Sequence, residues 1–262
     1  MVKKRIDILL VERKLAATPQ EAAALLMAGK VTVDDRRVTT PGTRVDADAR
    51  IRVRGGKPYA SRGGHKLAAA LDAFGVLPAG RVCADVGAST GGFTDVLLQR
   101  GAAKVYAIDV AYGDLAWKLR QDPRVVVMER TNARHLHRLP EPVSLVTVDV
   151  SFISLTQILP AVLGWLTPAA DIVPLVKPQF EAPREAVERG GVVRDPAVHA
   201  DVLATIIRWC RAHNLFVCRA IPSPLLGPAG NREFLLHLTT ISPPHLPSLD
   251  DLLHACLPGK SP

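Results

Sequence analysis

Four charged residues stand beside short apolar runs of the sequence, where site chemistry is expected. Lys66 precedes the first run of the second part of the chain, Asp149 and Lys177 end two later runs, and Glu233 begins the last one. In an open α/β sheet, the carboxyl ends of such strands face the ligand crevice. Two lysines and two carboxylates gathered there could hold a weakly acidic hydroxyl group and move its proton. Each residue alone could equally be a surface charge, and their order along the chain does not show that they converge.

A glycine-rich loop, Asp85-Val-Gly-Ala-Ser-Thr-Gly-Gly-Phe93, follows the first of these runs. Glycines let the backbone pass close to a ligand, and the helix expected after the loop offers free N–H groups. The spacing is neither the GxGxxG dinucleotide fingerprint nor a P-loop. A strand ending in Asp, then Gly and small residues, is instead similar to the S-adenosylmethionine loop of Rossmann-like methyltransferases. A plain tight turn is the alternative interpretation.

Two polar residues after the next two runs could complete a cofactor site. Asp109 ends the second run, where a carboxylate can accept hydrogen bonds from ribose hydroxyls, although it could also cap a helix. Asn132 follows the third run and could face an adenine edge. The expected cofactor-binding residues are therefore Asp85, Gly87, Ala88, Ser89, Thr90, Gly91, Gly92, Phe93, Asp109, Asn132 and Asp149.

Short apolar runs alternate with helical stretches over residues 61–242. The runs are Arg81–Asp85, Lys104–Asp109, Val125–Met128, Ser144–Asp149, Asp171–Val176, Phe216–Ala220 and Glu233–Leu238. This alternation predicts an α/β domain with a mostly parallel seven-stranded sheet and helices on both faces. The apolar stretch 155–176 contains three prolines and an aspartate, so it is interpreted as buried core and not as a membrane span.

The pattern of residues 1–60 predicts a small α+β domain. It consists of two short helices and a small sheet and ends in a short linker. Thr18 is the expected N-cap of the second helix, and Gly29 is expected to end it. The segment has 13 Lys/Arg against 7 Asp/Glu, whereas the other 202 residues have 20 against 18. A basic excess of this kind indicates a polyanionic partner. The candidate residues for binding this partner are Lys3, Lys4, Arg5, Arg13, Lys14, Lys30, Arg36, Arg37 and, at the junction, Arg62; a solvated charged face is the alternative.

The overall composition is that of a globular protein. The 262 residues are 48% hydrophobic and 22% charged, with a net charge of +8, which excludes a mainly disordered chain. The four cysteines have no zinc or disulfide spacing, and the N-terminal segment does not read as a signal peptide. We expect no metal and a reducing, cytoplasmic location. The Pro-rich segment 243–262 is expected to be a loosely attached tail.

The chain resembles the TlyA family, often labelled hemolysin A, of ribosomal RNA 2′-O-methyltransferases. The similarity rests on motifs in the family's order: Arg5–Leu10, Glu21–Asp34 and Arg50–Val53, then Ser61–Leu67, Asp85–Phe93, Asp149–Ser154, Val176–Glu181 and Gly230–Leu235. It implies an S4-like RNA-binding domain, an FtsJ-type Rossmann-like methyltransferase domain and S-adenosylmethionine as cofactor. It also implies that Lys66, Asp149, Lys177 and Glu233 form the catalytic tetrad, and that cytidine ribose in 16S or 23S RNA, free or in ribosomal subunits, is the substrate.

Other activities remain open at this point. Enzymes that methylate base amino groups often carry Asn/Asp-Pro-Pro-Tyr after the fourth strand, where this chain has Asp149-Val-Ser-Phe152. Carbon methylation would need a cysteine nucleophile, but Cys83 lies inside an apolar run and is interpreted as core. An RNA-binding assembly factor with a non-catalytic methyltransferase fold is the main alternative. A membrane-lytic protein is less favoured, because no spanning segment or long basic amphipathic helix is evident.

Overall fold

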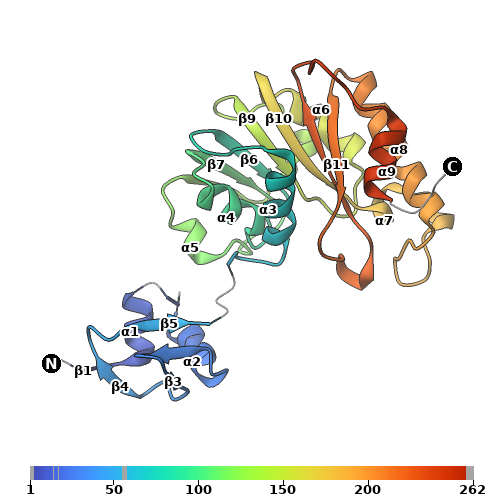
Figure 1. The fold of residues 1–262 in the computed structure, drawn as a ribbon. Helices are drawn as coiled ribbons and strands as arrows, with labels where there is room; N and C mark the ends of the chain where they lie inside the picture. The colour runs from blue at the N-terminus through green and yellow to red at the C-terminus, as the bar shows by residue number, and fades with distance from the viewer. Residues whose placement is uncertain (1–2, 14, 17, 55–57, 258–262) are drawn as a thin grey trace. The chain divides into compact units, whose positions relative to one another are not determined.

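The computed structural model describes residues 3–13, 15–16, 18–54 and 58–257 (Figure 1). The chain divides into two compact units, residues 1–58 and residues 59–262. Each unit has its own hydrophobic core, so each is described by itself.

The N-terminal unit is a small α+β fold. Its elements are β1 (Lys3–Arg5), α1 (Ile6–Glu12), α2 (Pro19–Met27), β2 (Val31–Val33), β3 (Arg36–Val38), β4 (Arg44–Asp46) and β5 (Ile51–Val53). Strands β3, β2 and β5 form an antiparallel sheet in that order, and β1 pairs with β4. The pairing of β1 with β4 was not predicted, because three-residue strands show too little alternation to be recognised.

Local sequence signals explain the second helix of this unit. The Thr18 hydroxyl accepts a hydrogen bond from the Glu21 backbone N–H at 3.1 Å, which caps α2 as expected. Gly29 takes a left-handed φ of 62° directly after the helix, a conformation that glycine adopts without strain. Ile6, Leu10 and Leu26 are fully buried and form the centre of the core between the helices and the sheet.

The C-terminal unit alternates strands and helices along the chain. Its elements are α3 (Gly63–Phe74), β6 (Val82–Val86), α4 (Gly92–Gln99), β7 (Lys104–Ile108), α5 (Trp117–Arg120), β8 (Val125–Met128), η1 (Ala133–His135), β9 (Val143–Val148), α6 (Leu155–Leu163), β10 (Leu166–Val176), α7 (Pro178–Glu181), η2 (Arg184–Ala186), α8 (Pro196–Ala212), β11 (Phe216–Pro222), η3 (Pro228–Gly230), β12 (Phe234–Thr239) and α9 (Leu249–Cys256). Each of the seven predicted apolar runs corresponds to one of these strands.

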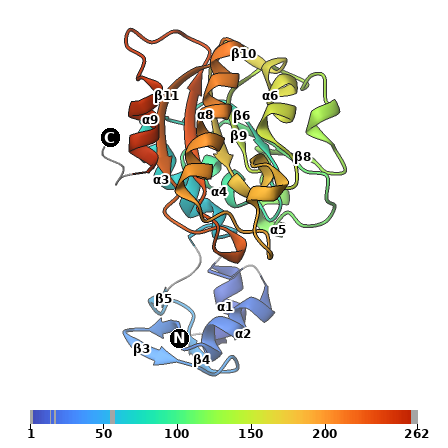
Figure 2. The ribbon, with the colours of Figure 1, turned by 90° about the vertical axis from the view of Figure 1, so that its right-hand side faces the viewer.

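The seven strands form one sheet in the order β11-β12-β10-β9-β6-β7-β8. The five strands from β10 to β8 are parallel, and β12 runs antiparallel to both of its neighbours. Helices α6, α8 and α9 pack on one face through one hydrophobic cluster, and α3, α4 and α5 pack on the other face (Figure 2). The predicted α/β class with a mostly parallel seven-stranded sheet is confirmed. The carboxyl ends of β6, β9 and β10 are neighbours at the centre of one sheet edge.

Two segments with unusual composition are part of the core. The apolar stretch 155–176 forms α6 and β10, and Trp165 between them is 2% exposed, so its interpretation as core is confirmed. The expectation of a loosely attached tail is wrong for α9, because Leu252 and Cys256 are buried against the main core. The prolines before this helix hid its short apolar face, although the Ser248 capping box marks its start. In the described part of the chain, no helix is long and apolar enough to cross a membrane.

Candidate active site

The four charged residues predicted to act together line one hollow of about 270 Å³ at the carboxyl edge of the sheet. Lys66 comes from α3, Asp149 follows β9, Lys177 follows β10 and Glu233 precedes β12. Since β9 and β10 are parallel neighbours and β12 is antiparallel to β10, the end of β9, the end of β10 and the start of β12 all reach the same edge. Strand pairing thus brings together residues that are far apart in the sequence.

Lys66 and Glu233 form a buried ion pair at the inner wall of the hollow. The Lys66 ammonium donates a hydrogen bond to Glu233 Oε2, and the two side chains are 9% and 0% exposed. Gly227 packs directly over the carboxyl group, because a Cβ at that position would lie 2.1 Å from Glu233 Oε1. This Oε1 is buried and has no hydrogen-bond partner among the described residues. Buried acceptors are rarely left unpaired, so this oxygen calls for a hydrogen-bond donor that the described residues do not supply.

Lys177 and Asp149 form a second ion pair, nearer to solvent. Lys177 Nζ lies 2.7 Å from Asp149 Oδ1 and donates a hydrogen bond to Ser151 Oγ at 3.0 Å. The contact with Asp149 is close but poorly aligned, and within the described chain Oδ1 receives no hydrogen bond of good geometry. We take it as an electrostatic contact for this reason. It anchors the amine while leaving a carboxylate lone pair and an ammonium N–H for a ligand.

The glycine-rich loop passes under this hollow at van der Waals distance. Gly87 has φ 84°, and a Cβ there would lie 2.3 Å from the Asp149 carbonyl oxygen. A Cβ on Gly92 would lie 2.1 Å from Ser61 Oγ and 3.0 Å from Gly64 N, so the first turns of α3 and α4 meet at glycine. Only glycine lets these backbones approach so closely. Of the loop residues predicted to bind cofactor, Gly87, Ala88, Ser89, Thr90, Gly92 and Phe93 line the hollow.

The structure places two of the predicted cofactor-binding residues elsewhere. Asp85 is fully buried beneath the loop, where its carboxyl group accepts hydrogen bonds from the hydroxyls of Thr94 (2.6 Å) and Thr147 (3.0 Å). Gly91 faces the underside of the loop, because a Cβ there would lie 2.1 Å from Leu119 Cδ1. Their contact with the cofactor stays a prediction, which their positions beneath the loop do not favour. Both hold the loop in shape, and neither lines the hollow beside it.

The buried Asp85 carboxyl predicts an unusual pH dependence of stability. Its pKa is raised to about 6, mainly by burial. The hydrogen bonds from the two threonine hydroxyls act to lower this pKa, and the nearby charge of Asp149 acts to raise it. The folded protein therefore holds the proton more tightly than the unfolded chain, and stability falls as the pH rises from about 4 to about 6. Asp85→Asn cannot ionise, so its free energy of unfolding at pH 7.5 should exceed that of the wild type by up to about 3 kcal/mol.

Urea unfolding at pH 4.5 and pH 7.5 checks this expectation. The difference between Asp85→Asn and wild type should shrink at the lower pH. The matched variant Asp72→Asn removes a carboxyl whose pKa is lowered by its hydrogen bond to Arg100, so it should not stabilise the protein at neutral pH. An equal pH response of Asp85→Asn and wild type would show that Asp85 is ionised in the folded state.

A second hollow of about 440 Å³ adjoins the first, and the two share Gly87, Ser89 and Asp149 as a wall. Asp109 Oδ2 accepts a hydrogen bond from Ser89 N at 2.7 Å, and Oδ1 accepts one from Ala111 N at 2.8 Å. Each oxygen keeps a lone pair that a ribose hydroxyl could use. The Asn132 side-chain oxygen caps η1 by accepting from Arg134 N, which leaves its NH₂ group available.

The residues present fit S-adenosylmethionine. The second hollow combines the Asp109 carboxylate and the Asn132 amide with an apolar lining from Ile108, Ile153 and Ile158, as a nucleoside requires. The glycine-rich loop lies between this hollow and the first one, which the four charged residues line. A nucleoside in one and a reactive group in the other would thus meet at Gly87 and Asp149.

One residue of this region was not included among the predicted site residues. Phe152 is 90% exposed, has φ 64° and lies at the rim of the second hollow, with its ring centroid 5.0 Å from that of Phe180. Left-handed backbone is rare for a bulky residue and collects at functional sites. An aromatic residue three positions after Asp149 was the available signal.

The predicted RNA-binding residues differ in how the fold employs them. Lys3, Lys30 and Arg36 are exposed, and no described side chain pairs with them. Lys4 pairs with Glu12, and Arg5 pairs with Asp7.

The remaining basic candidates make other contacts. Arg13 donates hydrogen bonds to the carbonyls of Ala47 and Ala49, so its main task is structural. Arg37 is exposed but donates to the Gly29 carbonyl, whereas Arg62 lines the first hollow. Lys14 lies outside the described residues.

Comparison with known proteins places the chain in a family. The profile of the FtsJ-like methyltransferases matches residues 59–240, and that of the S4 domain matches residues 4–51. The chain belongs to the FtsJ-like methyltransferase family. The resemblance drawn from the motifs is thereby confirmed, as is the presence of an S4 domain at the N-terminus.

Three similar proteins illustrate the relationship. The chain is 48% identical to the 16S/23S rRNA (cytidine-2′-O)-methyltransferase TlyA of Mycobacterium tuberculosis, with 97% of each chain covered. It is 39% identical to Hemolysin A of Brachyspira hyodysenteriae, with 83% of this chain and 92% of the relative covered. A solved structure, "Putative hemolysin from Streptococcus thermophilus", superposes with a TM-score of 0.73 at 40% identity over 97% of this chain and 94% of that one.

Proposed function

We propose that this FtsJ-like protein transfers a methyl group from S-adenosylmethionine to the ribose 2′-hydroxyl of a cytidine in ribosomal RNA. The observation that carries the proposal is the convergence of Lys66, Asp149, Lys177 and Glu233 in one hollow. That hollow shares its glycine wall with a second one suited to a nucleoside. The relative named as a cytidine-2′-O-methyltransferase, which matches over 97% of both chains, supports the choice of substrate.

The cofactor supplies a methyl group on a positively charged sulfur. The protein must hold the ribose oxygen in line with the carbon–sulfur bond at about 3 Å and give the hydroxyl proton a destination. As the oxygen–carbon bond forms and the carbon–sulfur bond breaks, that proton leaves the oxygen. The chain's own residues therefore have two tasks, which are to position a weak nucleophile and to move one proton.

We assign Lys177 to the position nearest to the ribose 2′-hydroxyl. Asp149 and Ser151 hold its amine at the outer side of the hollow, where an incoming nucleotide arrives first. In its amine form, Lys177 accepts the hydroxyl proton and later passes it to water. Asp149 orients this amine, and on the wall shared by the two hollows it would lie beside the sulfonium of a bound cofactor.

Lys66 and Glu233 act from the inner wall. Glu233 lines the hollow, and its buried Oε1 has no hydrogen-bond partner among the described residues, so we assign it to accept a hydrogen bond from the hydroxyl. Lys66 in turn holds the carboxylate in place. A hydrogen bond inside a water-poor site orients the oxygen more firmly than one made in solvent.

The remaining target atoms fit this site less well. Carbon methylation through a covalent adduct needs a thiolate, but Cys83 is fully buried and burial raises the pKa of its thiol to about 12. Phe152 offers an exposed ring at the rim of the second hollow, which shares a wall with the charged one, and a base can stack on this ring while its ribose enters the charged hollow. Among the described residues, no group of three His, Cys, Asp or Glu side chains could hold a metal ion.

Labelled S-adenosylmethionine and purified ribosomal subunits test the proposal directly. We expect label in ribosomal RNA at a cytidine, located by the resistance of its 3′ linkage to alkaline hydrolysis. Naked 16S and 23S RNA, tested in parallel, would show whether an assembled subunit is required. Cofactor binding without methyl incorporation into any of these substrates would favour the RNA-binding assembly factor instead.

The S4 domain is proposed to supply sequence-independent affinity for folded RNA. Changing its exposed, unpaired cations Lys3, Lys30 and Arg36 to alanine together should weaken RNA binding and lower the slope of log K against log salt by about 2 to 3. Filter binding at several salt concentrations measures this. An unchanged slope would place the phosphate contacts elsewhere.

Because ribosomal RNA is the proposed substrate, we place the protein in the cytoplasm.

A further inference from the structure

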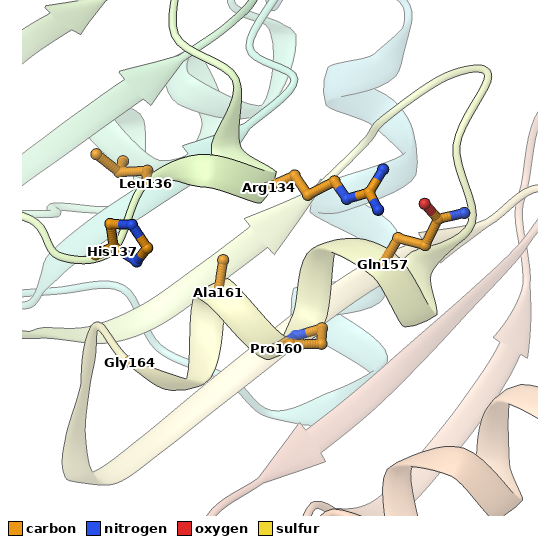
Figure 3. A pocket seen from close by; sticks show the side chains of 7 residues that line it. All are labelled: Arg134, Leu136, His137, Gln157, Pro160, Ala161 and Gly164. Atoms are coloured by element: carbon orange, nitrogen blue, oxygen red, sulfur yellow. The ribbon is translucent and has the colours of Figure 1, made fainter.

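A third hollow, of about 490 Å³, lies outside the proposed catalytic site. It is formed between the segment around η1 and helix α6, and its lining residues are Arg134, Leu136, His137, Gln157, Pro160, Ala161 and Gly164 (Figure 3). Arg134 and Gln157 bring a guanidinium and an amide to one end, whereas His137 lies toward the other end beside Ala161. A volume of this size falls in the usual range of ligand sites, about 300–1,000 Å³.

The surroundings of this hollow are positively charged. The exposed residues Arg134, His135, His137 and Arg138 follow one another in the chain, and no described carboxylate pairs with any of them. Some arginines of the same unit are neutralised by ion pairs, such as Arg100 with Asp72 and Arg120 with Glu129. An unneutralised basic segment next to a hollow therefore indicates an anionic ligand.

The lining also contains features that suit a nucleobase. Pro160 and Ala161 form an apolar surface on α6, and the Gln157 amide at its edge offers both a donor and an acceptor. The opposite wall is held in place, because Trp165 Nε1 donates a hydrogen bond to the Leu136 carbonyl at 2.9 Å. The hollow is thus a preformed pocket with basic residues beside it.

This third hollow lies next to the second hollow, the proposed cofactor site, which is called the cofactor hollow below. Asn132 and Ala133 line the cofactor hollow, and Arg134 directly after them lines this one. On α6, Ile158 faces the cofactor hollow and its neighbour Gln157 faces this one. The same two segments, around η1 and along α6, thus contribute residues to both hollows, which makes this hollow a neighbour of the proposed cofactor site.

We propose that this hollow binds one unpaired nucleotide of the RNA substrate, outside the nucleotide that is methylated. Arg134 and His137, which line the hollow, contact the backbone phosphates, while Pro160 and Gln157 receive the base. The lining is largely exposed, and the basic run extends beyond it, which suits a longer polyanion better than a free nucleotide. The proposal rests on the proposed function and adds a substrate contact in the methyltransferase domain.

Salt-dependent binding of the full-length protein to naked ribosomal RNA tests this. Arg134→Ala should weaken binding and lower the slope of log K against log salt by about 0.7 to 0.9, the amount for one phosphate contact. Arg134→Lys should restore the slope. Arg208→Ala, an exposed arginine on α8 with no described partner, is the matched control and should leave the slope unchanged. Cofactor affinity should remain within about twofold in all three.

Two further variants test the seat for the base. Gln157→Ala and Ala161→Trp, the second of which fills the hollow, should weaken RNA binding several-fold without changing the salt slope. An unchanged slope in Arg134→Ala, or unchanged affinity in both seat variants, would overturn the proposal. An effect seen only on assembled subunits would also overturn it, because the partner would then be a ribosomal protein. Failure of the wild type to bind RNA would contradict the proposed function instead.

Discussion

Lys177→Ala is expected to lower the rate of methyl transfer by at least about a thousand-fold while cofactor affinity stays within about twofold. The side chain lies between Asp149 and Ser151 at the outer side of the catalytic hollow, and it does not line the cofactor hollow. Its loss removes the proposed proton acceptor and leaves the Asp149 carboxylate without its cation. Binding of the cofactor should thus survive while the chemical step fails.

Single-turnover transfer of labelled methyl groups, together with calorimetric cofactor binding, measures the two effects separately. Lys177→Arg keeps the charge but cannot give up its proton near neutral pH, so it should be almost as inactive. Lys104→Ala removes an ion-paired lysine at the opposite end of a strand and should transfer methyl groups normally. Normal transfer by Lys177→Ala would show that our assignment of its role is wrong. Activity retained in Lys177→Arg alone would limit the role to electrostatics.

Gly87→Ala is expected to lower cofactor affinity by at least about a hundred-fold and to abolish transfer. The new Cβ would lie 2.3 Å from the Asp149 carbonyl oxygen and 3.3 Å from Val150 N, both of them backbone atoms. It would also have to adopt φ 84°, which costs a non-glycine residue about 1–2 kcal/mol. The ends of β6 and β9 must separate to accept it, and this movement displaces Asp149 and the wall shared by the two hollows.

Gly113→Ala is the matched control for backbone strain. Gly113 has nearly the same φ, 88°, but a Cβ there meets nothing within 4 Å. It should lose a similar amount of stability to strain and still bind the cofactor normally. Calorimetric titration of both variants, with their melting temperatures, tests the contrast. Equal cofactor affinity in Gly87→Ala and wild type would mean that the close approach to Asp149 is not needed for binding.

The strands of the α/β domain could be predicted well because each is a buried apolar run. Val125–Met128, for example, forms β8 with the bounds read from the sequence. β10 begins at Leu166, five residues before the predicted run, and its register relative to β9 shifts between Leu166 and Asp171. Helix α9 was overlooked since its apolar face is short and follows a Pro-rich stretch. Elements recognised by long periodic patterns were therefore found, and short ones that depend on tertiary packing were not.

Residue type at a strand end was a weaker guide to the site. Asp85 and Asp149 both end central strands, yet Asp85 is fully buried under the loop while Asp149 lines both hollows. Gly87 and Gly91 both have positive φ, but Gly87 approaches the Asp149 backbone and Gly91 accommodates Leu119. A sequence pattern indicates which residue type a position requires. The neighbours of that position in the folded protein determine whether the residue lines a site or supports the backbone.

Sequence patterns were enough to predict the class of the fold, the basic character of residues 1–60, the family and the identities of the four charged residues. That these four meet is known only from the folded chain, because Lys66 and Glu233 are 167 positions apart and pair through the arrangement of the sheet. The structure likewise revealed the exposed ring of Phe152 and the basic hollow at η1 and α6. Chain order specifies which side chains exist and where strands end. Which ends lie side by side depends on strand pairing, and that is set by packing of the whole sheet.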